Sequence, residues 1–178
     1  MSNISKLVGV VVDGIPTYDR TVRGEKFNRI TVDFNGITIP VLFSEYVVTE
    51  TELIGKIVVT GCLASDVKRG TIPKFYFYAN TIESAEDDAE PCSSVNFELK
   101  VTKIKGFQQN KQSRDILPLV CSTGNPISGT SVIYLCLMDG AARKFKDNEV
   151  GYTITGTGDL HAFRDIYEVY ADTAELRN

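Results

Sequence analysis

The 178-residue sequence contains no tryptophan and only one histidine, and its cysteines form no CxxC pair. The four cysteines are Cys62, Cys92, Cys121 and Cys136. The single histidine, His161, does not complete a zinc site with them. We therefore expect reduced cysteines, no metal and no cofactor. With one histidine and no nucleophile motif, the chain also lacks the parts of an active site, so we expect no enzyme.

No apolar run approaches the ~20 residues of a membrane span, and the first six residues, MSNISK, lack the regions of a secretory signal. We therefore expect a cytoplasmic protein with no membrane partner. The net charge of −4 at first argues against nucleic acid. However, residues 83–90 hold five of the 23 acids and no base, so the rest of the chain carries +1. The overall charge therefore says little about the surfaces of the folded units.

Short segments with strand-like alternation dominate the sequence, and long helical periodicity is absent. In the first half we predict strands at 6–12, 27–34, 37–43, 56–63 and 74–82. In the second half the predicted strands are 96–106, 115–121, 130–138, 152–160 and 166–173. Helical turns are predicted at 49–54 and near 141–145. The Asn35-Gly36 pair predicts a two-residue hairpin turn, and residues 14–24 predict a charged loop.

The two halves share local sequence in the same order. Residues 54–63 (IGKIVVTGCL) are similar to residues 150–160 (VGYTITGTGDL), and residues 77–81 (FYANT) to residues 169–173 (VYADT). Two such matches at nearly the same separation indicate an internal repeat. Five strands with a short helix between the third and the fourth is the order of an OB barrel, whereas an SH3-like barrel lacks that helix.

The sequence therefore predicts an all-β chain of two tandem five-stranded OB-fold barrels, each with a short helix between strands 3 and 4. We place the first OB-fold domain at residues 1–83, an acidic linker at 84–94 and the second domain at 95–178. Within the second domain, Gly156-x-Gly158 predicts a β-bulge rather than a phosphate loop, because no helix follows it.

Two stretches of the second half resemble bacterial single-stranded DNA-binding proteins and their primosomal relatives. Residues 130–145 (TSVIYLCLMDGAARKF) are similar to the third strand and following helix of that family, and residues 150–160 to its fourth strand. The resemblance implies an OB fold and a role in DNA replication, recombination or repair. It also implies a homodimer that presents four OB units, with replication or recombination proteins as candidate partners.

The chain departs from that family in two respects. It has no tryptophan on the expected binding strands, and it ends at residues 174–178 (AELRN) instead of in an acidic tail that closes on phenylalanine. Recruitment of repair enzymes through such a tail is therefore not implied.

Binding of single-stranded DNA requires cations for the phosphates and flat side chains on which bases stack. In an OB barrel these belong on strands 2 and 3 and on the loops between strands 1 and 2 and strands 4 and 5. The candidates in the first unit are Tyr18, Arg20, Arg23, Lys26, Arg29, Lys68, Arg69, Lys74 and Tyr76. Those in the second unit are Lys105, Phe107, Lys111, Arg114, Tyr134, Phe163 and Arg164. The other first-unit aromatics are predicted to be core residues, namely Phe27, Phe34, Phe43, Phe75 and Phe77.

The leading hypothesis is a non-catalytic, sequence-tolerant binder of single-stranded DNA. The alternative is an OB-fold protein-interaction or replication-restart accessory module, which the acidic pI of about 5.1 and the lack of tryptophan favour. An enzyme with a nuclease-like carboxylate pair is a third hypothesis, although no motif places two carboxylates together. The residues leave open whether DNA or RNA is preferred and whether both units bind.

Overall fold

The computed structural model describes residues 3–48 and 50–177 and is all-β apart from one short helix in those ranges. The strands of the first half are β1 (Ser5–Val22), β2 (Glu25–Phe34), β3 (Ile37–Ser44), β4 (Lys56–Asp66) and β5 (Lys74–Ser84). Those of the second half are β6 (Ser94–Ile104), β7 (Gln108–Gln109), β8 (Asp115–Asn125), β9 (Gly129–Met138), β10 (Thr153–Phe163) and β11 (Ile166–Leu176). The helix, α1, spans Asp139–Phe145. No helix in the described part of the chain is long and apolar enough to span a membrane.

The first half is a closed barrel with the strand order β1-β2-β3-β5-β4. Neighbouring strands are antiparallel except β3 and β5, which are parallel. The hairpin predicted between β2 and β3 is confirmed: Asn35 and Gly36 adopt φ of +54° and +87°, the left-handed pair that a two-residue turn requires. Alternation along β2 directs Val32 and Phe34 into the barrel, where both are fully buried.

The second half repeats the same pairing order. Its strands form a sheet in which β6 also pairs with β8, so β6, β8, β9, β11 and β10 are joined in the order found for β1, β2, β3, β5 and β4. Strands β9 and β11 are parallel, as β3 and β5 are. The predicted helix after the third strand is confirmed as α1, which buries Ala141, Ala142 and Phe145.

Both halves also carry a β-bulge between their last two strands. The register shifts at Thr60/Gly61 in the first half, and between Thr157 and Asp159 in the second. A Cβ atom on Gly158 would lie 2.5 Å from the Tyr170 carbonyl oxygen, so the backbones approach more closely than a side chain permits. The predicted bulge at Gly156-x-Gly158 is therefore confirmed.

Two predictions for the first half are wrong. Residues 14–24 are not a loop, because β1 continues as a bulged strand to Val22 and turns at residues 23 and 24. The second error concerns the helical turns at 49–54. The described residues 50–54 are not helical, and residue 49 lies outside the described part. Their backbone bonds to β1 instead: the Leu53 amide donates to the Gly14 carbonyl oxygen, and the Val11 amide to that of Gly55.

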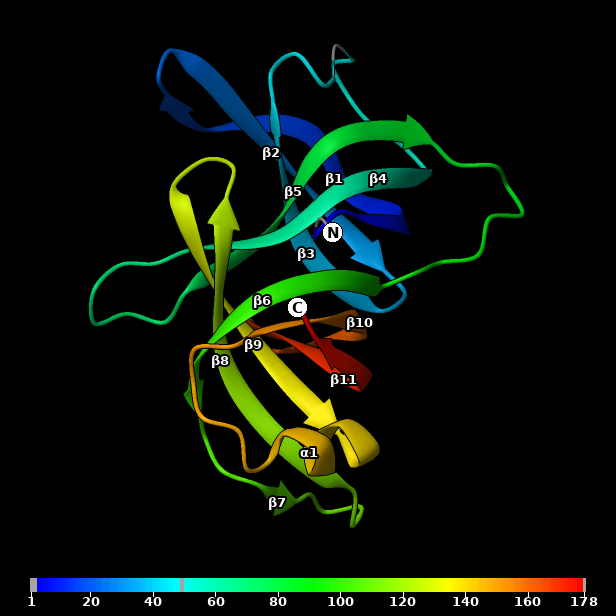
Figure 1. The fold of residues 1–178 in the computed structure, drawn as a ribbon. Coiled ribbons are helices and arrows are strands. Elements are labelled where there is room, and N and C mark those ends of the chain that lie inside the picture. Colours follow the sequence, from blue (N-terminus) through cyan, green and yellow to red (C-terminus); the bar gives the residue numbers. More distant parts are fainter. Residues whose placement is uncertain (1–2, 49, 178) are drawn as a thin grey trace.

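The two halves pack directly on each other, one above the other in Figure 1. Buried residues of both halves belong to one continuous hydrophobic cluster. It contains four of the five phenylalanines predicted to be core residues, and the fifth, Phe27, is also buried, at 5% exposed. The Phe75 ring lies 5.5 Å from the Tyr134 ring and 5.9 Å from the Tyr167 ring. The Tyr167 hydroxyl donates a 2.6 Å hydrogen bond to the Thr38 carbonyl oxygen.

A buried polar network joins β4 to the β8–β9 hairpin. The Ser65 amide donates to Ser131 Oγ at 3.0 Å, and the Ser65 hydroxyl donates to the Val132 carbonyl oxygen at 2.7 Å. Asn125 Nδ2 donates to the Ser65 carbonyl oxygen and to the Tyr76 hydroxyl. Asn125 Oδ1 accepts hydrogen bonds from two backbone amides of the hairpin. Since buried polar groups without partners are costly, this network holds the halves in one arrangement.

The acidic segment between the halves is held in place. Lys56 Nζ donates to the carbonyl oxygens of Asp87 and Ala89 at 2.7 and 2.8 Å, and Cys92 forms a β-bridge with Val8. In Figure 1 this segment lies on the right, between β5 and β6, and the β4–β5 loop lies on the left. The carboxylates of the acidic segment are therefore kept away from the basic loops.

We expect Asn125→Ala to lower the free energy of unfolding by about 1–3 kcal/mol, because it leaves buried polar groups of both halves without hydrogen-bond partners. Chemical denaturation followed by circular dichroism measures the change. Asn80→Ala, at an exposed asparagine of β5, is the matched control and should alter stability little. Equal effects of the two substitutions would contradict the role of the network.

Burial raises the pKa of Cys121 to about 12 and that of Cys136 to about 11. Both thiols should therefore resist iodoacetamide at pH 8 in the native protein and react only after unfolding, because the thiolate is the nucleophile. Tandem mass spectrometry gives the site-specific rates, because Cys121 and Cys136 lie in the same tryptic peptide, with the half-buried Cys92 as the internal reference. Native labelling of Cys121 as fast as that of Cys92 would contradict the described packing.

Candidate nucleic-acid interface

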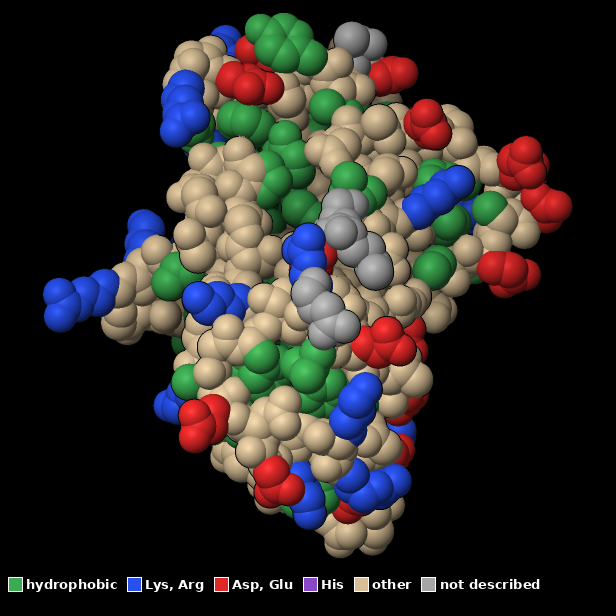
Figure 2. All heavy atoms as spheres, in the orientation of Figure 1, with side chains coloured by type: hydrophobic (Ala, Val, Ile, Leu, Met, Phe, Trp, Pro, Cys, Tyr) green, Lys and Arg blue, Asp and Glu red, His purple; other side chains and the backbone are tan. Residues whose placement is uncertain are grey.

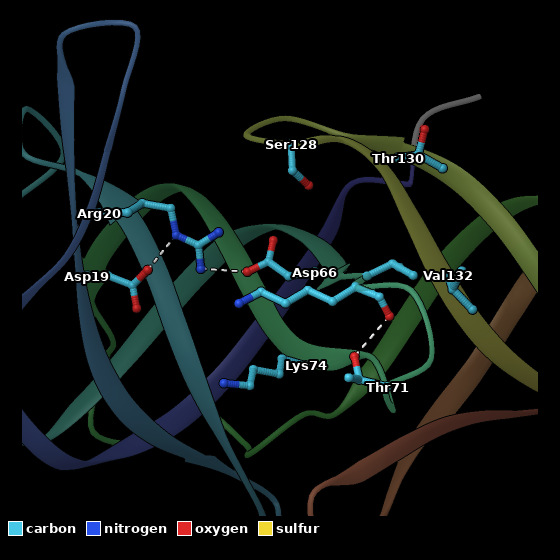
Figure 3. Close-up of a pocket in the computed structure, with 10 residues that line it drawn as sticks. Asp19, Arg20, Asp66, Thr71, Lys74, Ser128, Thr130 and Val132 are labelled. Carbon is cyan, nitrogen blue, oxygen red and sulfur yellow. Dashed lines mark hydrogen bonds and ion pairs between the residues drawn. The ribbon is translucent and has the colours of Figure 1, made fainter.

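A cleft of about 790 Å³ lies where three hairpins of the two halves meet, as Figure 3 shows. The first half contributes the end of β1 and the β4–β5 loop, and the second half contributes the β8–β9 hairpin. The residues that line the cleft are Asp19, Arg20, Asp66, Val67, Lys68, Thr71, Lys74, Ser128, Thr130 and Val132. The cleft therefore exists only because the two halves are packed together.

Arg20 lies between two carboxylates at one wall of the cleft (Figure 3). Its Nε is 2.5 Å from Asp19 Oδ2, and its Nη2 is 2.5 Å from Asp66 Oδ2. Its Cζ is also 5.7 Å from the centre of the Tyr76 ring. The hydrogen bond that Arg20 donates to Asp66 raises the pKa of the guanidinium. The predicted cation is thus in the cleft, but two anions already neutralise it.

Tyr76 is 3% exposed, so in this structure its ring has no free face on which a base could stack. The side chain points out of the first barrel, where it packs with Leu42 and Ala64 and is covered by Ile127 of the second half. Its hydroxyl meets Asn125 and Asp66, and burial raises its pKa. Tyr76 therefore supports the cleft wall from behind.

Five first-half candidates are exposed cations that form no ion pair among the described residues, namely Arg23, Lys26, Lys68, Arg69 and Lys74. Lys68 and Lys74 line the cleft. Arg69 lies next to Lys68 in the β4–β5 loop, and Figure 2 shows Lys and Arg side chains projecting at the left, where this loop lies in Figure 1. Arg23 lies at the turn between β1 and β2, with a φ of +52°.

The remaining first-half candidates lie on the β1–β2 hairpin. Tyr18 is 63% exposed, and its hydroxyl is 3.2 Å from Thr21 Oγ1. Arg29 is exposed, with Nη1 3.9 Å from Asp19 Oδ1. An exposed aromatic ring and a cation thus flank the same hairpin that supplies Arg20.

The second-half candidates are split between two places. Phe163 and Arg164 lie at the β10–β11 turn, where Phe163 is 72% exposed and Arg164 Cζ is 5.4 Å from its ring centre. The others lie away from this turn. The half-buried Tyr134 lies at the contact between the halves, 5.5 Å from the Phe75 ring, and Lys105 Nζ is 5.1 Å from its ring centre.

The candidates nearest to α1 and β7 are partly engaged with other side chains. Arg114 bonds to Asp139 and Asp172, at 2.6 and 2.7 Å from Nη2. Phe107 is 40% exposed, and Lys111 is exposed in the loop after β7. Lys146, which sequence reasoning missed, has its Nζ 5.7 Å from the Phe107 ring.

Sequence reasoning also missed the cleft residues that come from the other half. Ser128 and Thr130 face the β4–β5 loop across the cleft, but no local pattern marks a polar hairpin as the wall of a distant barrel. The carboxylates Asp19 and Asp66 were missed as well. Asp19 precedes Arg20 in the sequence, but no local pattern places Asp66, at the end of β4, beside an arginine of the β1–β2 hairpin.

The whole chain shares its fold with a known DNA-binding protein. The wild-type single-stranded DNA binding protein from Thermus aquaticus superposes with a TM-score of 0.78 and 16% identity, over 99% of this chain and 93% of that one. A deletion mutant of the same protein gives a TM-score of 0.77 at 16% identity, over 99% and 95%. The expected all-β class is confirmed, as a closed five-stranded barrel with a second sheet. No protein-family model and no curated protein matches the sequence.

Proposed function

We propose that this chain is a non-catalytic, sequence-tolerant single-stranded DNA-binding protein that acts in DNA replication, recombination or repair. The observation that carries the proposal is the fold shared, over almost the whole of both chains, with the single-stranded DNA binding protein from Thermus aquaticus. The unpaired cations around the cleft support it, because phosphate binding by Lys and Arg supplies most of the affinity for a flexible strand.

In this proposal each half is an OB barrel, with domains at residues 1–83 and 95–178 and the acidic linker at 84–94. The identical pairing order and the matching bulges of the two halves support the assignment. Only the second barrel has the helix after its third strand within the described residues. The two barrels thus differ at the place where the bonds from residues 53 and 55 to β1 replace a helix.

The proposal includes a homodimer that presents four OB units. An exposed apolar group supports it: Val12 is 62% exposed on the outer face of β1, Ile15 is 57% exposed, and Ile54 is 79% exposed on the segment bonded to β1. Exposed apolar side chains that cluster in this way are typical of protein–protein contacts.

Light scattering should give twice the 19.7 kDa chain mass for the native protein. The double variant Val12→Asp and Ile54→Asp should give the mass of one chain, because two charges would have to be buried in the interface. Val150→Asp, at a 56% exposed apolar residue elsewhere, is the control and should leave the dimer intact. A wild-type mass of one chain would refute the dimer.

Fluorescence anisotropy should detect tight binding to poly-dT that weakens steeply as salt rises, because condensed counterions are released on binding. Combined Arg23→Glu, Lys68→Glu and Arg69→Glu should reduce the salt slope by about 2 and the affinity at 0.1 M salt by about 100-fold, if each cation neutralises one phosphate. Arg20 is left unchanged, because its replacement by Glu would put three acids together.

The matched control carries the same change in charge outside the cleft, as Lys6→Glu, Lys100→Glu and Lys103→Glu, all at exposed positions. It should keep most of the affinity. If wild-type protein shows no salt-dependent binding to poly-dT, the proposed function is wrong. The protein-interaction or replication-restart module then becomes the better hypothesis.

A further inference from the structure

Two further hollows continue the cleft toward the second half. One, of about 480 Å³, shares Lys74 with the cleft and is lined by residues of both halves. The other, of about 490 Å³, shares Phe163 and Ile166 with the first hollow and lies wholly on the second half. The three depressions therefore adjoin one another from the β4–β5 loop to the β10–β11 turn.

The middle hollow is lined mostly by apolar side chains, and each half contributes one cation to its lining. Ile72 of the β4–β5 loop is 62% exposed, and Phe163 of the β10–β11 turn is 72% exposed. Lys74 comes from the first half and Arg164 from the second, with Asp165 as the only acid among the lining residues. An apolar recess flanked by two cations matches a nucleotide, which has a flat apolar face and an anionic phosphate on each side.

The walls of the middle hollow are held by the contact between the halves. Its floor includes Phe75 and Tyr167, whose rings are 5.9 Å apart, and Tyr167 is bonded to Thr38. A recess built on buried residues keeps its shape before a ligand arrives, which lowers the entropic cost of binding.

The third hollow offers a second aromatic surface. The rings of His161 and Tyr170 stack with their centres 4.0 Å apart and their planes 18° from parallel. Phe163 lies on the shared border, so a strand that leaves the middle hollow would meet this pair next. The hollow also contains Glu168, so its contribution to binding would come from stacking more than from charge.

We propose that a single DNA strand passes from the first half to the second through the middle hollow, with one base seated between Ile72 and Phe163 and its flanking phosphates at Lys74 and Arg164. This inference rests on the proposed function and adds the path of the strand. The two halves then form one continuous binding surface within the chain, joined at Lys74.

The absence of tryptophan makes a direct test possible. Phe163→Trp places one fluorophore at the hollow, and Tyr46→Trp, at a 77% exposed tyrosine elsewhere, is the matched control. On addition of oligo-dT of about 30 nucleotides, long enough for more than one OB unit, the first variant should be quenched by a stacked base. The control should keep its fluorescence.

Anisotropy measured on the same samples separates the two levels of the proposal. If the 30-mer binds but Phe163→Trp is not quenched, or both variants are quenched equally, the path through the hollow is wrong and the proposed function stands. If the 30-mer does not bind to wild-type protein, the proposed function fails and the path fails with it.

Affinity for strands of two lengths is the second measurement. Phe163→Ala removes an exposed ring and should weaken binding of the 30-mer by about 5- to 150-fold, the range for loss of one stacked base. The loss should be smaller for an oligo-dT of about 8 nucleotides, which can bind to the first half without reaching Phe163. Tyr46→Ala should change neither. An equal affinity of Phe163→Ala and wild-type protein for the 30-mer would overturn the inference.

Discussion

The buried contact between the two halves, which includes the Phe75 ring, holds together both the cleft and the middle hollow. Phe75 packs on Tyr134 and Tyr167, and the Asn125 network ties the β8–β9 hairpin to β4. The two walls of the cleft come from opposite halves of the chain, and so do the two sides of the middle hollow. If the halves separated, the cleft would open and several buried polar groups would lose their partners, so packing and binding geometry depend on the same residues.

The charges of the chain are sorted in space more than in the sequence. Lys56 holds the acidic segment by its backbone carbonyl groups, on the side away from the β4–β5 loop (Figure 1). Around the cleft, Arg20 is neutralised by Asp19 and Asp66, whereas its neighbour Lys68 is not ion-paired in the described part of the chain. An acidic protein can thus present a basic surface, because at physiological salt exposed charges act over only about 8 Å.

The strands were predictable because the signals for them are local. Each of the ten predicted strands overlaps an observed one, and the Asn35-Gly36 turn and the Gly156-x-Gly158 bulge lie where expected. The failures occurred where a contact distant in sequence decides the backbone. Residues 50–54 bond to β1 instead of forming a helical turn, and β1 extends through residues 14–22 because β2 pairs with it.

The sequence by itself determined the β class, the internal repeat, the buried phenylalanines and the basic character of the loops, because alternation, turn chemistry and hydrophobicity are properties of neighbouring residues. Only the tertiary structure decided which of those residues face a ligand. Tyr76 has the pattern of a surface residue beside loop cations, yet the second half covers it. Ser128 and Ile72 lie more than fifty residues apart, and packing of the halves places them along one surface. A local pattern does not encode such contacts, because they arise when one half of the chain buries the outer face of the other.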